Sequence, residues 1–175
     1  TLLGQGAEAH AVALDAGESV VVAGNTGPVS YFPVTAGAFV QVPPGPYTGP
    51  NAFAARLSAD GSSLIWGSVW GGAIADDVTG VALDAFGNVY VAGYTRSIDF
   101  PTTPGVFQPQ IGTPFSFRPT FISKLNRSGS TLEYSTYLGG GCAEQGRAIA
   151  VDALGLVYVT GQTFSTDFPG AAAGS

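Results

Sequence analysis

Three near-copies of one phrase occur along this chain of 175 residues. They are VALDAGESVVVAGNTGPVSYFP (residues 12–33), VALDAFGNVYVAGYTRSIDFP (81–101) and IAVDALGLVYVTGQTFSTDFP (149–169). Asp15, Asp84 and Asp152 mark the same place in each copy, and the two intervals between them differ by a single position. A chain with so regular a period folds as a row of equal units, each packed on its neighbours.

The period also holds between the copies. AFAARLSADGSSL (52–64) returns one period later as TFISKLNRSGSTL (120–132), and WGSVWGG (66–72) returns at the same interval as YSTYLGG (134–140). Each unit is predicted to contain four short strands, which in the middle copy span residues 80–84, 88–95, 121–126 and 131–138. The turn at Asp60-Gly61 is a strong hairpin signal, because glycine tolerates positive φ.

Both faces of the second predicted strand are apolar. Val89 and Val91 point to one side, and Tyr90 and Tyr94 to the other, so the sheet must be covered on both faces. Only 10% of the residues are charged, while 26 glycines and 12 prolines fit short strands joined by turns. We therefore expect an all-β chain of tandem four-stranded antiparallel β-propeller blades. A β-sandwich is the alternative, but it needs no such period.

The phrases DAFGNVYVAGYT, SIDFPTTPGVFQ, FISKLNRSGSTLEYSTYLGG and AIAVDALGLVYVTGQTFSTDFP resemble the bacterial β-propeller repeat called SBBP, and more loosely the NHL-type blade. The first copy departs most from the pattern, with AGES where the second has AFGN. The resemblance implies a secreted or cell-surface bacterial protein. It brings no established catalytic residues.

The repeat divides the chain into four parts. They are the end of a preceding fourth strand (1–8), blade 1 (9–72), blade 2 with its inter-blade connection (73–146), and the first hairpin of an incomplete blade 3 (147–175). About two and a half blades cannot close a ring that needs at least four. The expected partners are therefore other blades of a longer chain, or copies of this chain. A stable solitary fragment is the third alternative.

Charge and hydropathy exclude two classes of partner. The formal net charge is −6, with six Lys and Arg in total and no basic run, whereas a nucleic-acid surface needs clustered positive charge. No window of 18 apolar residues is present, so no membrane span is expected. Cys142 is the single cysteine and cannot form an intrachain disulfide.

No residues are predicted to be catalytic or to bind a cofactor. His10 is the only histidine, and Thr79 and Arg147 hold its place in the other copies, which favours a solvated strand edge over a general base. GQGAEA (4–9) loosely resembles a dinucleotide motif, but a strand pattern follows it instead of the required helix.

The repeated carboxylates have a structural and a metal-binding interpretation. Asp15, Asp84 and Asp152 follow the first strand of each unit, where aspartate typically accepts hydrogen bonds from a turn. Asp99 and Asp167 precede Phe-Pro and are weak candidates for calcium ligands. Asp76 and Asp77 are adjacent and should point to opposite sides of a strand, which disfavours a paired acid–base role.

Aromatic and basic side chains on the strands also have two interpretations. Four aromatic residues lie on predicted fourth strands, where they could stack on sugars or pack between blades, and packing is favoured: Trp66, Trp70, Tyr134 and Tyr137. Arg56 and Lys124 share one repeat position and suggest a structural salt bridge or a stem lying along apolar surface.

The sequence favours a non-enzymatic extracytoplasmic scaffold or protein-interaction surface that can self-assemble. The Pro-rich segments 25–51 and 96–120 would form its binding face. A carbohydrate-binding propeller, with glycans or surface proteins as partners, is the first alternative. A propeller enzyme whose active site lies on other blades is the second.

Overall fold

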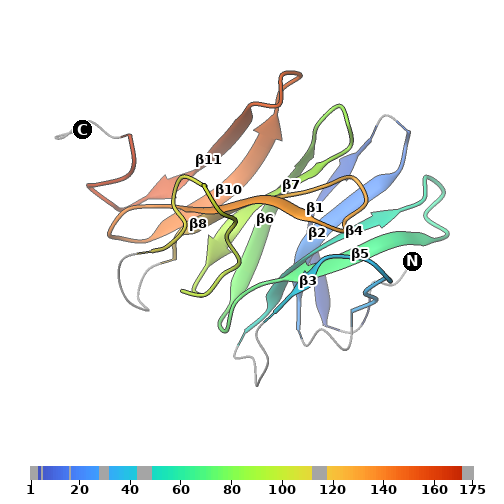
Figure 1. The fold of residues 1–175 in the computed structure, drawn as a ribbon, viewed down its shortest axis with the longest axis horizontal. Helices are drawn as coiled ribbons and strands as arrows, with labels where there is room; N and C mark the ends of the chain where they lie inside the picture. Colours follow the sequence, from blue (N-terminus) through green and yellow to red (C-terminus); the bar gives the residue numbers. More distant parts are fainter. Residues whose placement is uncertain are drawn as a thin grey trace.

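The computed structural model describes residues 4, 6–15, 17–27, 32–42, 49–111 and 118–170. These residues form strands and turns, and none of them forms a helix long and apolar enough to cross a membrane. The strands make three separate sheets (Figure 1). The first sheet has the order β1 (Ala7–Leu14), β2 (Val20–Thr26), β4 (Asn51–Leu57), β5 (Leu64–Trp70) and β3 (Val40–Gln41). The second runs β6 (Asp76–Leu83), β7 (Val89–Thr95), β8 (Thr120–Leu125) and β9 (Leu132–Leu138). The third is the hairpin of β10 (Glu144–Val151) and β11 (Val157–Thr163).

This architecture confirms the expectation of an all-β, propeller-type chain that does not close into a ring. The four strands expected in the middle copy are β6 to β9. However, β6 begins at Asp76 instead of residue 80, and β1 and β10 begin at the equivalent positions. Of the expected end of a preceding fourth strand (1–8), residues 1–3 and 5 lie outside the described residues, and Ala7 and Glu8 belong to β1.

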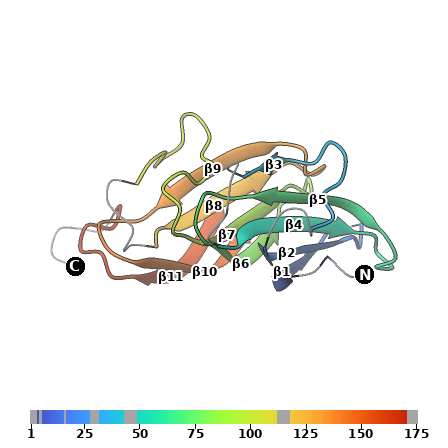
Figure 2. The same cartoon turned by 90° about the horizontal axis from the view of Figure 1, so that it is seen from below.

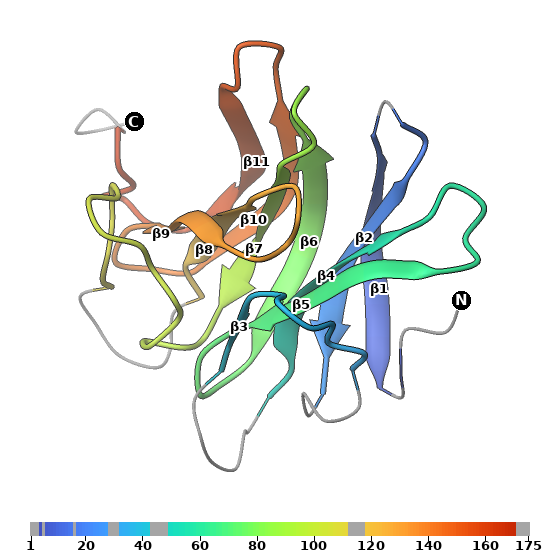
Figure 3. The ribbon, with the colours of Figure 1, turned by 45° about the vertical axis from the view of Figure 1, so that its right-hand side comes forward.

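The three sheets stand side by side in chain order (Figure 3). In Figure 2 the first strands β1, β6 and β10 lie along the lower margin, while β3, β5 and β9 lie along the upper one. Two contacts related by the repeat connect neighbouring first strands. His10 Nδ1 lies 2.8 Å from the carbonyl oxygen of Val78, and the Thr79 hydroxyl donates to the carbonyl of Gly146 at 2.7 Å.

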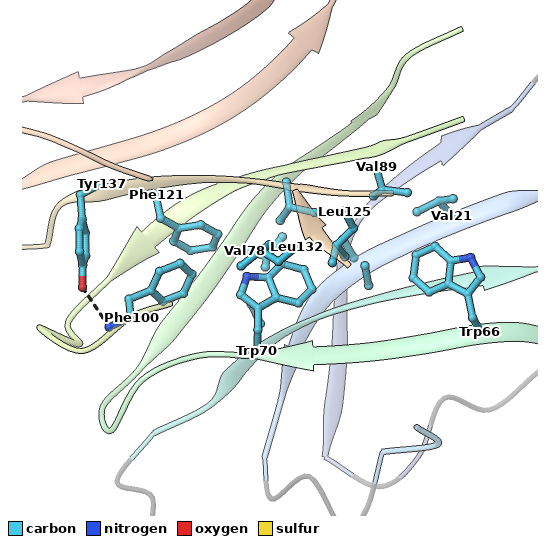
Figure 4. Packing of buried hydrophobic residues seen from close by; sticks show 14 residues of the cluster. Val21, Trp66, Trp70, Val78, Val89, Phe100, Phe121, Leu125, Leu132 and Tyr137 are labelled. Carbon is cyan, nitrogen blue, oxygen red and sulfur yellow. Dashed lines mark hydrogen bonds between the residues drawn. The ribbon is translucent and has the colours of Figure 1, made fainter. Parts of the chain in front are cut away.

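The main core lies between the first and second sheets (Figure 4). The first sheet contributes Val21, Trp66 and Trp70, and the second contributes side chains such as Phe121 and Leu125. A smaller cluster built around Phe32 and Phe53 covers the opposite face of the first sheet. Both faces of the first sheet therefore carry packed apolar side chains, although Val12 and Leu14 of β1 stay exposed.

One glycine in each second strand is required by close backbone approach. A Cβ on Gly24 or Gly93 would lie 1.9 Å from the carbonyl oxygen of Glu8 or Asp77, and on Gly161 it would lie 2.2 Å from that of Gln145. The first strand bulges opposite each of these glycines. The repeated glycine thus lets every first hairpin bend in the same way.

The Pro-rich segments lie along the outer edges of the sheets. In the first, β3 pairs in parallel with β5, and it is the only regular strand between β2 and β4 among the described residues. In the second, Thr103 N–H donates to the carbonyl of Ser135 at 3.0 Å, and Tyr137 N–H donates to that of Gln108 at 3.1 Å. Unpaired strand edges invite association, and these segments cover them. Residues 28–31, 43–48 and 112–117 of the two segments lie outside the described residues.

Candidate functional site

The aspartate that ends each first strand organises a turn. In every copy one carboxylate oxygen accepts two backbone N–H groups at 2.9 Å, from the residues two and four positions later. This confirms the predicted turn role of Asp15, Asp84 and Asp152. A hydrogen bond from the Ser19 hydroxyl holds the pKa of Asp15 below its usual value, and the Leu156 N–H does so for the pKa of Asp152.

A second polar cluster, which we call the blade joint, lies where one sheet passes to the next. In the first blade joint, Asp76 at the start of β6 is fully buried. Its carboxylate accepts the N–H of Gly72 at 2.7 Å and the hydroxyl of Thr95 at the end of β7. The Ser97 hydroxyl accepts the N–H of Ile74 at 3.0 Å. The joint therefore fastens the β5–β6 connection to the end of the second strand.

The second blade joint repeats these contacts one period later, with glutamate in place of aspartate. Glu144 is 1% exposed and accepts the hydroxyls of Thr163, at 3.2 Å, and Ser165. Gly140 N–H donates to the same carboxylate at 3.2 Å, and Cys142 N–H donates to Ser165 Oγ at 2.8 Å. Cys142 therefore takes part in the second blade joint through its backbone N–H.

The first sheet lacks this carboxylate. Ala7 occupies the position equivalent to Asp76, and the buried hydroxyl of Thr26, equivalent to Thr95, has no hydrogen-bond partner among the described residues. The blade joint was not predicted from the sequence, because Asp76 was compared only with its neighbour Asp77. Glu144 follows Asp76 at the same interval at which Thr163 follows Thr95. This equal spacing was the signal that could have found the joint.

Both calcium candidates belong to the blade joints. Asp99 Oδ1 accepts the N–H of Ala73 at 3.0 Å, and Asp167 Oδ1 accepts that of Gly141 at 2.8 Å. The joint is also tightly packed, since a Cβ on Gly72 would lie 2.2 Å from Ser97 Cβ. In the described part of the chain, no three His, Cys, Asp or Glu side chains are grouped so that they could hold a metal ion.

Asp76 and Asp77 point to different partners, as predicted for neighbours on a strand. Asp77 Oδ1 accepts the Asn25 amide at 2.7 Å, and Asn25 Oδ1 accepts the N–H of Val78 at 2.8 Å, so Asn25 ties β2 to β6. His10 lies near this contact, with Nε2 3.6 Å from the Glu8 carboxylate. Through its contact with the carbonyl oxygen of Val78, His10 connects the first strands β1 and β6.

The two basic residues at one repeat position form structural ion pairs, as predicted. Arg56 pairs with Asp15, and their side chains are 4% and 7% exposed. Its second terminal nitrogen donates to the carbonyl of Gly87 in the next sheet at 2.6 Å. Lys124 pairs with Glu133 at 3.0 Å and lies 5.3 Å from the centre of the Tyr90 ring.

The fourth-strand aromatic residues pack between sheets. Trp66 is 4%, Trp70 0% and Tyr137 1% exposed, and only Tyr134 is half-buried. Trp66 Nε1–H donates to the carbonyl of Arg127 at 2.9 Å. The Tyr137 hydroxyl donates to Ser97 O at 2.8 Å and accepts the Phe100 N–H at 2.9 Å (Figure 4). Three of the four rings are therefore buried and cannot stack on a sugar at the surface.

An open cleft of about 950 Å³ lies between the first and second sheets. It runs from the Asp15 turn to the β8–β9 hairpin tip, and Arg56, Trp66 and Arg127 line it together with asparagine and serine side chains. This cleft was not predicted from the sequence, because it is formed by turns of two different blades.

Comparison with known proteins finds a repeat family that matches two segments of the chain. The family model of the SBBP β-propeller repeat matches residues 69–101 and 133–169. No curated protein matches the chain. Each matched segment begins in a fourth strand, passes through a blade joint and the following hairpin, and ends at Phe-Pro. The matched unit therefore contains the blade joint as a whole.

Proposed function

We propose that this chain, which carries two copies of the SBBP β-propeller repeat, is a non-enzymatic scaffold that offers blade faces to protein partners. In the described residues the repeated carboxylates are engaged in turns and blade joints, and the basic strand residues in ion pairs. These groups serve the fold, which supports a structural role. The resemblance to SBBP proteins supports a secreted or cell-surface location in a bacterium.

The exposed face of β1 carries this proposal. Val12 and Leu14 are 65% and 69% exposed. Their equivalents in β6, Val81 and Leu83, pack against the core between the first two sheets. A position that is buried between two sheets in β6 but open to solvent in β1 favours a further blade as the partner of β1. That blade belongs to a longer chain, to a second copy or to a surface protein.

Carbohydrate binding is the second candidate, and one observation favours it. The cleft of about 950 Å³ is lined by Asn88, Asn126 and Ser128, whose side chains can bind sugar hydroxyls. Trp66 in the same cleft is buried and cannot stack on a sugar ring. We therefore expect no bound glycan on an array. A glycan whose binding is lost in Asn126→Ala would favour the second candidate.

Light scattering tests the proposed scaffold role. The chain has a mass of 17.7 kDa, and we expect association above this mass as its concentration rises. Val12→Asp combined with Leu14→Asp should keep the chain monomeric, because each aspartate places a charge in the contact. Phe86→Asp, at a turn tip where the phenylalanine is 78% exposed, is the matched control. Association that the double variant leaves unchanged would contradict the role of this face.

A further inference from the structure

The cleft of about 950 Å³ between the first and second sheets is positively charged, in a chain whose net charge is −6. The ionisable side chains that line it are Asp15, Arg56 and Arg127. Asp15 and Arg56 pair with each other, so the charge of Arg127 is not balanced within the cleft. Asp84 lines a smaller neighbouring groove together with Arg127, but its carboxylate accepts the hydrogen bonds of its own turn. The cleft therefore has one positive charge to offer an anion.

Arg127 has a fixed main chain and an unpaired guanidinium group. Its N–H donates to Asn88 Oδ1 at 3.1 Å, and its carbonyl accepts the Trp66 Nε1–H at 2.9 Å. Its side chain is exposed and makes no hydrogen bond or ion pair with a described residue. The stem passes Gly87, where an added Cβ would lie 3.2 Å from Arg127 Cδ. The fold thus positions the base of this side chain and leaves its planar set of donors free.

Arg56 contributes a second guanidinium group to the cleft, and this one is buried. The residue is 3% exposed, and its terminal nitrogens donate to Asp15, Ser19 and Gly87. Its Nε–H, however, has no hydrogen-bond partner among the described residues. Burial lowers the pKa of Arg56, and the positive charge of Arg127 lowers it further. The two guanidinium groups therefore repel each other, and an anion bound beside them is stabilised by both.

The cleft also has an apolar part. Ile65 of β5 is 51% exposed, and it lines the cleft together with Ala36 and Ala38. The tip of the β8–β9 hairpin contributes the hydroxyls of Ser128 and Ser130. Exposed isoleucine gains from contact with another apolar group, because both then lose their contact with water. A ligand that complements this cleft therefore combines one anionic group with an apolar group.

We propose that this cleft binds a short segment of a protein partner in which one carboxylate side chain lies beside an apolar side chain. A carboxylate matches Arg127, because it can accept two parallel hydrogen bonds from a guanidinium group. Its single negative charge also equals the unbalanced charge of the cleft. The apolar side chain of the segment covers Ile65.

The shape and charge of the molecule favour such a segment over other carboxylate ligands. Sites for small molecules enclose most of the ligand surface, whereas this cleft is open to solvent and wide enough for a chain to pass across it. A strongly acidic segment is disfavoured, because the net charge of −6 repels it. The inference rests on the proposed role as a protein-interaction scaffold, and it names the chemical group that a partner presents.

The capped peptide acetyl-Gly-Leu-Glu-Leu-Gly-amide, whose glutamate is its only charge, tests the proposal by NMR titration of the intact chain. We expect the backbone amide signals of Asn88, Arg127 and Ser128 to shift, and the affinity to fall as salt is added. The same peptide with glutamine in place of glutamate should bind at least about fivefold more weakly, because a charge-assisted hydrogen bond is lost. Equal affinity of the two peptides would overturn the proposal, and so would no binding of either.

Variants of the chain locate the two contacts. Arg127→Gln removes the unbalanced charge and should weaken binding of the glutamate peptide to the level of the glutamine peptide. Arg147→Gln, at an exposed arginine outside the cleft, should not. Ile65→Ser should also weaken binding, whereas Ile98→Ser, at an isoleucine that is 55% exposed and outside the cleft, should leave it unchanged. Full affinity in Arg127→Gln would overturn the proposal.

Two further measurements separate this proposal from its alternatives. Inorganic phosphate that displaces the peptide at equal concentration would show a general oxyanion site, and the assignment to a carboxylate segment would be wrong. Val12→Asp combined with Leu14→Asp should bind the peptide as the natural chain does, because neither residue lines the cleft. If the chain associates through these two residues but ignores the peptide, the cleft proposal alone fails. If it does neither, the scaffold role fails too.

Discussion

Asp76 is an ionisable residue that is fully buried, and its surroundings determine its protonation state. Burial raises its pKa to about 7, against hydrogen bonds from Thr95 and Gly72 that lower it. In an unfolded chain the same group ionises near its ordinary value of 3.8. At pH values between 3.8 and about 7, Asp76 keeps its proton in the folded chain and loses it in the unfolded chain. The stabilising contribution is therefore complete below about pH 4 and is lost as the pH rises towards 7.

The variant Asp76→Asn should remove this dependence on pH. The amide is neutral at every pH and can still accept the Gly72 N–H. We expect the free energy of unfolding of the natural chain to fall between pH 5 and pH 7, by up to about 1.4 kcal/mol per pH unit from this group. The variant should show a smaller fall. Urea unfolding of both proteins at several pH values measures the difference, and parallel pH profiles would show that Asp76 is ionised throughout.

Glu18 has an unfavourable backbone conformation for its type. Its φ is +61°, while Gly87 and Gly155 take the same turn position in the other copies with φ of +80° and +82°. Left-handed backbone costs a residue with a Cβ about 1–2 kcal/mol relative to glycine. Glu18→Gly should therefore raise the free energy of unfolding by about 1 kcal/mol, partly offset by the greater entropy of the unfolded glycine.

Glu18→Ala is the control for this prediction. It removes the side chain but keeps the Cβ, so it should give no comparable gain in urea unfolding. A glycine variant no more stable than the alanine variant would contradict the account of the turn.

At the scale of elements, the β8–β9 hairpin of the second sheet is docked against the first. Gly129 at its tip accepts the N–H of Phe39 and the Ser68 hydroxyl, both at 2.7 Å. A Cβ on Gly129 would lie 2.5 Å from the Trp66 ring. The equivalent Gly61 in the β4–β5 hairpin has nearly the same φ, +68° against +67°, but no atom within 4 Å of its Cβ position.

These two glycines form a matched pair for substitution. Gly61→Ala and Gly129→Ala add the same backbone strain, but only Gly129→Ala also adds a clash with Trp66. We expect Gly129→Ala to cost about 1–3 kcal/mol more in urea unfolding. Equal costs would mean that the hairpin is not held against the first sheet.

The sequence predicted the strands and turns of each unit, but not where the first strands begin. The four residues DDVT at the start of β6 look like a polar connection, yet Asp76 and Val78 are fully buried. Their burial depends on hydrogen bonds to Thr95 and Asn25, which lie elsewhere in the chain. Local polarity could not reveal such partners. The Pro-rich segments were likewise predicted as loops, and their position along the strand edges depends on tertiary contacts.

At the scale of the whole molecule, the nearly constant period of the repeat predicted the row of blades. It also predicted that the row is open, because the count of units could be read directly. The places where the copies differ could not be interpreted from the sequence alone. Ala7 in place of Asp76 and the exposed residues of β11 acquire meaning only when equivalent contacts are compared in space.

Three equivalent hairpins differ in what covers them, and hydrogen exchange of the intact chain measures this difference strand by strand. Amides at equivalent positions of β2, β7 and β11 should be compared one by one. We expect slow exchange throughout β2 and β7, which have neighbours on both edges. In β11 the amides on the outer edge should exchange orders of magnitude faster than their equivalents, because exchange follows local opening and exposure. Equal protection in all three strands would show that β11 is covered in the same way as β2 and β7.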